Sequence, residues 1–184
     1  MFKRSYFFLF IALFLTAILI VYQQLGGFKD PEISFVDLHE YHIAGTYYEG
    51  KVTSGKWESL FFQTRDLIES SQLPGILTII WYNQPEREKG FARAFIGVQF
   101  DDDPQIPAGL EIRTVQMDGV IRATMKSHVT VMPNPQKIAR KINEWAVVNQ
   151  YELQDLLIEM YPEESAIYSE IPVAKKSSGF RPIK

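Results

Sequence analysis

The nine residues "LLIEMYPEE" (156–164) have the alternation of a β-strand and place a carboxylate between Leu157 and Tyr161. The alternation of a β-strand places Leu156, Ile158 and Met160 on one face. Leu157, Glu159 and Tyr161 then lie on the opposite face. Because burying an unpaired carboxylate is costly, Glu159 must point to water, have a partner or meet a cationic or hydrogen-bonding ligand.

Composition narrows the possible functions. The chain has 184 residues, a net charge of -3 and a pI near 5.7. Proteins that bind a nucleic-acid backbone usually have a basic face. Because the net charge of this chain is negative, we expect no nucleic-acid partner. There is no cysteine, which excludes disulfides, thiolate metal sites and a cysteine nucleophile. The three histidines form no spaced ligand set, and we expect neither a metal nor a cofactor.

Residues 1–24, "MFKRSYFFLFIALFLTAILIVYQQ", read as a single membrane anchor. Lys3 and Arg4 precede an uncharged run, Ser5 to Gln24, that is long enough to span a bilayer as a helix, with Tyr6 and Tyr22 suited to the two interfaces. The alternative is a cleaved signal peptide, but the apolar region is unusually long and no small-x-small cleavage site follows. The positive-inside rule predicts a cytoplasmic amino terminus, with the domain on the outer side, the periplasm in a bacterium.

The rest of the chain divides into a linker (25–34), a domain (35–174) and a flexible tail (175–184). The spacing predicts a strand over 35–48, a helix within 53–73 that ends near Pro74 and Gly75, and strands over 76–84 and 91–100. After the acidic loop "DDDPQIPAG" the order restarts. Paired strands over 110–117 and 119–131 precede a helix over 134–150 with Asn134 as N-cap, and two closing strands follow. The predicted fold class is α+β, with duplicated β-α-β-β modules that form an antiparallel sheet with two helices, preceded by one transmembrane helix.

The two modules can be compared residue by residue. Laying "IIWY" (79–82) over "IEMY" (158–161) gives a repeat of about eighty residues, with Tyr82 opposite Tyr161 and Ile80 opposite Glu159. Trp81 should then face the other side of the sheet, beneath a helix. The seam between two packed halves is a preferred place for a ligand pocket.

These residues carry a resemblance to the GyrI-like domain family, a small-molecule-binding module also found as the effector-binding part of bacterial transcription regulators. "HIAGTYYEG" resembles the opening strand of the family, "IIWYNQP" its tyrosine-rich strand and turn, "LLIEMY" its Glu-x-Tyr strand and "YSEIPV" its closing strand. The resemblance covers roughly Val36 to Val173. A single membrane helix ahead of such a domain is similar to the animal endoplasmic-reticulum autophagy receptor that carries a GyrI-like domain.

The resemblance implies a pocket between the modules, with Glu159 inside it. Tyr161 and Tyr82 would be aromatic walls suited to cation-π contact, and we place Tyr48 in the same site. The sequence departs from the family where Gly50, Lys51 and Val52 replace a Gly-Pro-Tyr turn, and where Arg93, Ala94 and Phe95 replace an Arg-x-Asp. The structural alternative for Glu159 is a carboxylate at a sheet edge or one paired with Arg93 or Arg122. The aromatic residues could equally fill a core.

Three functions follow. The leading hypothesis is a membrane-tethered domain that binds a small apolar or cationic molecule without catalysis. The second is an adaptor that uses its outer surface to bind a protein partner. The third is a hydrolase of strained electrophilic toxins, with Glu159 as general base, an activity that the resemblance allows. No Ser-His-Asp constellation, phosphate-binding Gly loop or dinucleotide fingerprint occurs, and we therefore favour a protein that is not an enzyme.

Overall fold

The chain forms three helices and nine strands within the residues that the computed structural model describes, which are 2–24, 30–37, 40–82, 89–101, 104–125, 135–163 and 166–176. The helices are α1 (Phe2–Gln24), α2 (Gly55–Glu69) and α3 (Pro135–Val148). The strands are β1 (Glu32–Val36), β2 (Glu40–Lys51), β3 (Ile76–Trp81), β4 (Phe91–Phe100), β5 (Glu111–Gln116), β6 (Val120–Met125), β7 (Tyr151–Leu153), β8 (Leu157–Glu163) and β9 (Ala166–Lys176). The fold class is α+β, as the sequence predicts.

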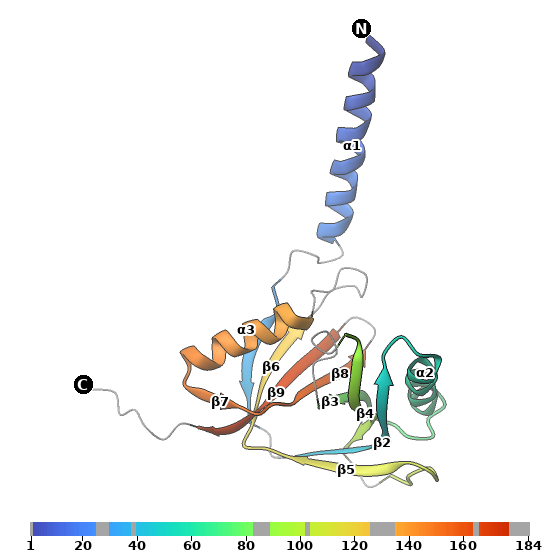
Figure 1. Ribbon diagram of the computed structural model, residues 1–184, viewed down its shortest axis with the longest axis vertical. Helices are drawn as coiled ribbons and strands as arrows, with labels where there is room; N and C mark the ends of the chain where they lie inside the picture. Colours follow the sequence, from blue (N-terminus) through green and yellow to red (C-terminus); the bar gives the residue numbers. More distant parts are fainter. Residues whose placement is uncertain are drawn as a thin grey trace, which may run out of the picture.

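The strands form an antiparallel sheet in the order β1-β6-β9-β8-β3-β4-β2-β5, and β7 pairs with β9 (Figure 1). Strands β3 and β8 pair at the centre, with Ile79 opposite Glu159 and Leu77 opposite Tyr161. Residues that pair across a ladder point to the same face. The strand order thus places the predicted Glu-x-Tyr strand, β8, in the middle of the sheet and not at its edge.

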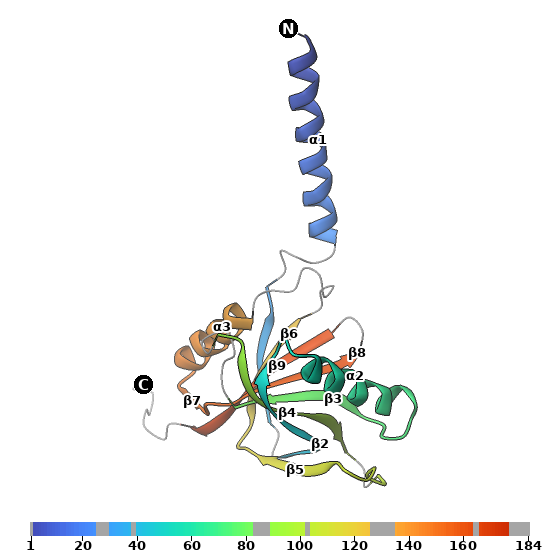
Figure 2. The ribbon, with the colours of Figure 1, turned by 45° about the vertical axis from the view of Figure 1, so that its right-hand side comes forward.

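Helices α2 and α3 cover the same face of the sheet on either side of this central pair (Figures 1 and 2). The α2 side chains Leu60, Phe61 and Ile68 pack over β3 and β4. The α3 side chains Ile138 and Ile142 pack over β6 and β9. Tyr161 contacts both clusters, which places β8 at the gap between the two helices.

The opposite face of the sheet encloses a second core. The alternation of β8 predicted from the sequence is confirmed, because Ile158 and Met160 are buried in this core. The hydroxyl of Tyr41 on β2 donates to Glu170 Oε2 on β9 at 2.6 Å, and Arg122 Nε donates to Glu170 Oε1 at 2.5 Å. Strands β2 and β9 are not neighbours in the sheet order, so the sheet must curl around this core to bring them together.

Both predicted helices of the domain form. Ser54 caps α2, because its side chain accepts a hydrogen bond from the Trp57 backbone N–H at 3.2 Å. The helix ends at Glu69, before the predicted Pro74-Gly75 stop, because Ser70 and Ser71 form a turn with Ser71 at φ 57°. Helix α3 buries Ile138 and Ile142 as predicted, while its predicted cap Asn134 lies outside the described residues.

The predicted single strand over 35–48 is wrong. The structure forms β1 and β2 instead, and these two strands lie in distant parts of the sheet: β1 pairs with β6, whereas β2 pairs with β4 and β5. Strand β1 begins at Glu32, within the segment assigned to the linker, and β9 runs to Lys176, two residues into the assigned tail. Continuous β-forming composition cannot reveal where one strand leaves the sheet and the next begins.

Helix α1 contains the candidate membrane span, Tyr6–Gln24. By length and composition this is the one helix in the described part of the chain that could cross a bilayer, and a signal sequence would meet the same criteria. None of the span is buried against the domain, which excludes a core helix of this fold. Asp30 forms an ion pair with Lys141 Nζ on α3 at 2.5 Å.

Candidate functional site

Glu159 lies at the gap between α2 and α3 and accepts two hydrogen bonds on one oxygen. Trp81 Nε1 donates to Glu159 Oε2 at 2.7 Å, and the Tyr161 hydroxyl donates to the same oxygen at 3.4 Å. The register of β3 and β8 explains the first contact, since Ile79 pairs with Glu159 and Trp81 is two residues further on the same face. Two aromatic donors thus orient the carboxylate.

Helix α2 adds two more aromatic rings. Trp57 and Phe61 are four residues apart and so lie on one face of the helix. The ring of Trp57 is 5.2 Å from that of Trp81, and the ring of Phe61 meets that of Tyr161 edge to face at 6.2 Å. We call Trp57, Phe61, Trp81 and Tyr161 the aromatic cage. It brings α2, β3 and β8 together on the face of the sheet that carries Glu159.

The aromatic cage is neither buried nor fully exposed. Its four side chains and Glu159 are all half-buried, whereas Ile158 and Met160, on the other face of β8, are 0% and 2% exposed. All four rings also pack against the apolar cluster of β3 and β4, so each has one side in the core and part of its surface exposed to solvent. The aromatic cage can therefore be reached from solvent.

The electrostatics of the site depend on Tyr161 staying neutral. Burial raises the pKa of the Tyr161 hydroxyl well above its ordinary value, and the negative charge of Glu159 and their hydrogen bond raise it further. At neutral pH Tyr161 is therefore a hydrogen-bond donor. The site presents one carboxylate among aromatic faces, an arrangement that attracts cations through charge and through the ring quadrupoles.

Tyr48 lies on the same face of the sheet as Trp81 and is buried beside Trp57. It is only 2% exposed, and its hydroxyl donates to the Lys51 carbonyl at 2.7 Å and lies 2.6 Å from Ser54 Oγ. Its ring packs 5.1 Å from the ring of Trp57. Since Ser54 also caps α2, Tyr48 fixes the start of the helix that carries Trp57. The structure thus gives Tyr48 a supporting position in place of the predicted ligand contact.

Tyr82 lies on the other face of the sheet, so it cannot share a wall with Tyr161. Its side chain packs against the second core, and its hydroxyl accepts a hydrogen bond from Arg113 Nη1 at 2.8 Å. The residue that contacts Glu159 is its neighbour Trp81. Trp81 does lie beneath a helix, as predicted, but Glu159 and Tyr161 share that face. The predicted alignment of Tyr82 with Tyr161 put the two on one face, whereas the β3–β8 register puts them on opposite faces.

The suggested partner Arg122 is also wrong. Arg122 binds Glu170 on the opposite face and stacks on Tyr168 at 4.7 Å. Glu170 is fully buried, whereas Glu159 is not. The alternation of β4 places Arg93 on the same face as Phe95, away from Glu159.

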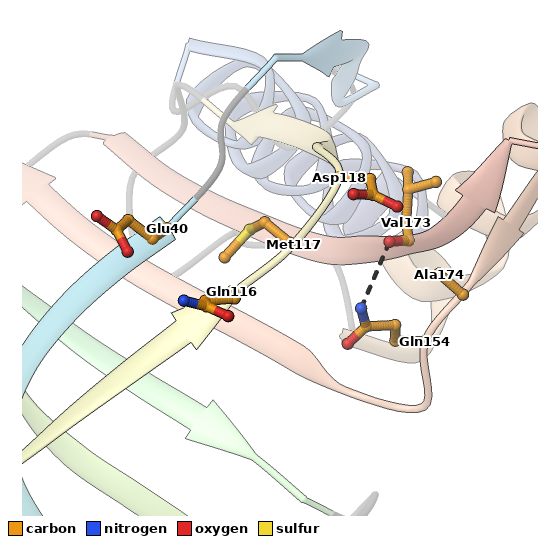
Figure 3. Close-up of a pocket in the computed structure, with 7 residues that line it drawn as sticks. All are labelled: Glu40, Gln116, Met117, Asp118, Gln154, Val173 and Ala174. Atoms are coloured by element: carbon orange, nitrogen blue, oxygen red, sulfur yellow. Dashed lines mark hydrogen bonds between the residues drawn. The ribbon is translucent and has the colours of Figure 1, made fainter.

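The cavities lined by described residues include the following three, and one of these adjoins the aromatic cage. The cavity in Figure 3, about 540 Å³, lies between the β5–β6 turn, the start of β2 and the end of β9, and none of the predicted site residues lines it. A second, about 380 Å³, lies between α2 and the segment before β5. The third, about 320 Å³, we call the α2 cavity, and its lining is Val52, Thr53, Ser54, Trp57, Glu58, Phe61 and Phe62. Within the described ranges, no three His, Asp or Glu side chains gather as metal ligands.

Comparisons with known proteins concern the fold. No family model and no curated protein matches the sequence. The structure of SAV2435 bound to tetraphenylphosphonium has a TM-score of 0.50 and 16% identity, covering 79% of this chain and 94% of that chain. A hydrolase from Listeria innocua has a TM-score of 0.50 and 10% identity, covering 79% and 92%. An integron cassette protein of Vibrio cholerae has a TM-score of 0.47 and 13% identity, covering 79% and 96%.

The chain shares its overall fold with these solved proteins, SAV2435 and the Listeria innocua protein among them. At these low identities the similarity concerns the fold alone. It agrees with the resemblance that the strand motifs indicate. The comparisons give no support to the more specific resemblance to the autophagy receptor.

Proposed function

We propose that this chain is a membrane-tethered GyrI-like protein that binds a small apolar cation in the aromatic cage, without catalysis. The observation that carries the proposal is the position of Glu159. Its carboxylate is half-buried, oriented by Trp81 and Tyr161, and placed beside aromatic rings from α2. A cation in this position gains charge attraction from Glu159 and cation-π attraction from the rings.

A similar fold supports this choice of ligand class. SAV2435, whose structure contains tetraphenylphosphonium, shares the fold of this chain. Tetraphenylphosphonium is a permanent cation covered by aromatic rings. Such a cation needs one negative charge and several aromatic surfaces, and the aromatic cage offers this combination.

The architecture in the proposal has two duplicated modules behind a membrane anchor. The strand order supports duplication, because β2-α2-β3-β4 and β6-α3-β8-β9 each arrange their strands in the same way, with β3 and β8 meeting at the centre. The central seam is then the interface between the modules. Helix α1 supports tethering through its length and apolar composition. An apolar cation concentrates in membranes, so a tethered domain would meet its ligand close to the bilayer.

The proposal is tested by isothermal titration of tetraphenylphosphonium into the full chain in lipid nanodiscs, with empty nanodiscs as the reference. We expect Glu159→Gln to weaken binding by about 1.4–2.8 kcal/mol, or about tenfold to a hundredfold, from Coulomb's law at about 6 Å with an effective dielectric of about 20–40. The control Glu144→Gln removes an exposed carboxylate from α3 and should leave binding unchanged. Equal affinity of wild type and Glu159→Gln would remove the proposed cation site.

Hydrolysis is the second candidate, and one contact favours it. Tyr161 keeps its proton beside Glu159, so the pair could in principle supply a general acid and a general base. The Listeria innocua structure of similar fold is described as a hydrolase. Product analysis with a strained electrophile distinguishes the two candidates: turnover that disappears in both Glu159→Gln and Tyr161→Phe would favour hydrolysis over simple binding.

A further inference from the structure

The α2 cavity continues the aromatic cage along one side of the helix. Trp57 and Phe61 belong to both, so the two spaces are immediate neighbours. Glu58 and Phe62 are the residues that follow Trp57 and Phe61, and they also lie four residues apart. They therefore form a second row on α2 beside the row that faces the sheet. A ligand held at Glu159 would have this second row within reach.

The α2 cavity is large enough for a separate chemical group. Its volume of about 320 Å³ is roughly twice the ~150 Å³ that accommodates a benzene molecule in a protein interior. Its lining combines the aromatic side chains Trp57, Phe61 and Phe62 with the short side chains of Val52, Thr53 and Ser54. Phe62 is 50% exposed, so part of its ring is accessible from the cavity. A second aromatic group could cover this ring.

The α2 cavity also carries one charge of its own. Glu58 is the one charged residue in its lining. Among the described residues, the Glu58 side chain forms no hydrogen bond or ion pair. In a capping box, the side chain three residues after the N-cap bonds back to the backbone of the cap residue. Trp57 occupies that position relative to Ser54, so Glu58 does not have this role. The carboxylate is therefore available to a ligand.

We infer that the site accepts an elongated bis-cation with an aromatic group at each end. One cationic end would occupy the aromatic cage at Glu159, and the other would lie in the α2 cavity against Phe62 with its charge towards Glu58. This inference rests on the proposed function and extends it from a ligand with one charge to a ligand with two charges. Joining two binding groups makes the second contact intramolecular, which raises affinity if the linker matches the separation of the two sites.

The test compares a mono-cation with its doubled form. The probes are methyltriphenylphosphonium and a series in which two triphenylphosphonium groups are joined by methylene linkers of increasing length. Binding to the full chain in nanodiscs is measured by isothermal titration. We expect the best bis-cation to bind at least about tenfold more tightly than the mono-cation. Two identical ends alone would give a statistical gain of only about twofold.

Two variants distinguish binding in the α2 cavity from binding in the aromatic cage. Glu58→Gln should reduce the affinity for the bis-cation about threefold to fivefold, the size expected for an exposed ion pair, and leave the mono-cation unchanged. Phe62→Ala should remove most of the gain from doubling. Glu69→Gln, at the far end of the same helix, is the matched control and should have no effect on either probe.

The outcomes distinguish the two claims. If the mono-cation binds and depends on Glu159, but the bis-cation gains no more than the statistical factor, the second compartment is refuted while the proposed function stands. A gain that survives both Glu58→Gln and Phe62→Ala would also refute it. If neither probe depends on Glu159, the proposed function and this inference fail together.

Discussion

The hydrogen bond from Trp81 to Glu159 gives a prediction that can be calculated from the structure. A charge-assisted bond at 2.7 Å contributes about 1.5–3 kcal/mol when well buried. Glu159 is half-buried, so water can replace part of the bond, and we reduce the expected contribution to about 1 kcal/mol. Trp81→Phe keeps an aromatic ring beside Trp57 but loses the donor.

A double-mutant cycle isolates this contribution from the packing that Trp81→Phe also removes. The cycle combines Trp81→Phe with Glu159→Met, which keeps the length of the side chain but has no charge. The free energy of unfolding is measured for the full chain in detergent by urea titration, followed by far-ultraviolet circular dichroism. We expect a coupling energy of about 1 kcal/mol. A coupling below about 0.3 kcal/mol, within the usual additivity of independent sites, would refute the view that Trp81 orients the carboxylate.

Three further predictions concern the groups around the two cores. Burial and Glu159 raise the pKa of Tyr161 in the folded state, so its contribution to stability is complete below pH ~10 and should be lost at up to about 1.4 kcal/mol per pH unit above it. Urea titrations at increasing pH should show a smaller loss of stability for Tyr161→Phe than for wild type. An equal loss would contradict the assignment. Glu170→Gln should lower the free energy of unfolding by about 2–4 kcal/mol, since it leaves the partly buried Arg122 without its charged partner; a loss below about 1 kcal/mol would show that water compensates Arg122. Ser54→Ala should cost about 1 kcal/mol by removing the cap of α2, and Ser54→Asp, which can also cap, should restore most of it.

The helices of the domain and the face pattern of β8 could be predicted because they depend on local spacing. Trp57 and Phe61 recur at the period of a helix, and Ser54 is a preferred cap. The alternation around Glu159 is equally local. The structure confirms that Leu157 and Tyr161 point to one face of β8 and that Ile158 and Met160 point to the other. These features need no knowledge of which strands become neighbours.

The composition of the site could not be predicted, because it depends on pairing between distant strands. Trp81 and Glu159 are brought together by the β3–β8 register, which the sequence does not specify. Comparing the two strand motifs aligned Tyr82 with Tyr161. Because neighbouring residues of a strand point to opposite faces, this alignment placed Tyr82 in the site and Trp81 outside it. Tyr48 was misplaced for a different reason: its hydroxyl is used by the cap of α2, a contact that follows from the tertiary fold.

Crystallography with tetraphenylarsonium would show where this protein binds an apolar cation. This cation has the same shape and charge as tetraphenylphosphonium, and its arsenic atom can be located by anomalous scattering. We expect one strong arsenic peak beside Glu159, within about 6 Å of the aromatic rings of the cage. A peak found only elsewhere, for example in the cavity of Figure 3, with no arsenic beside Glu159, would contradict it.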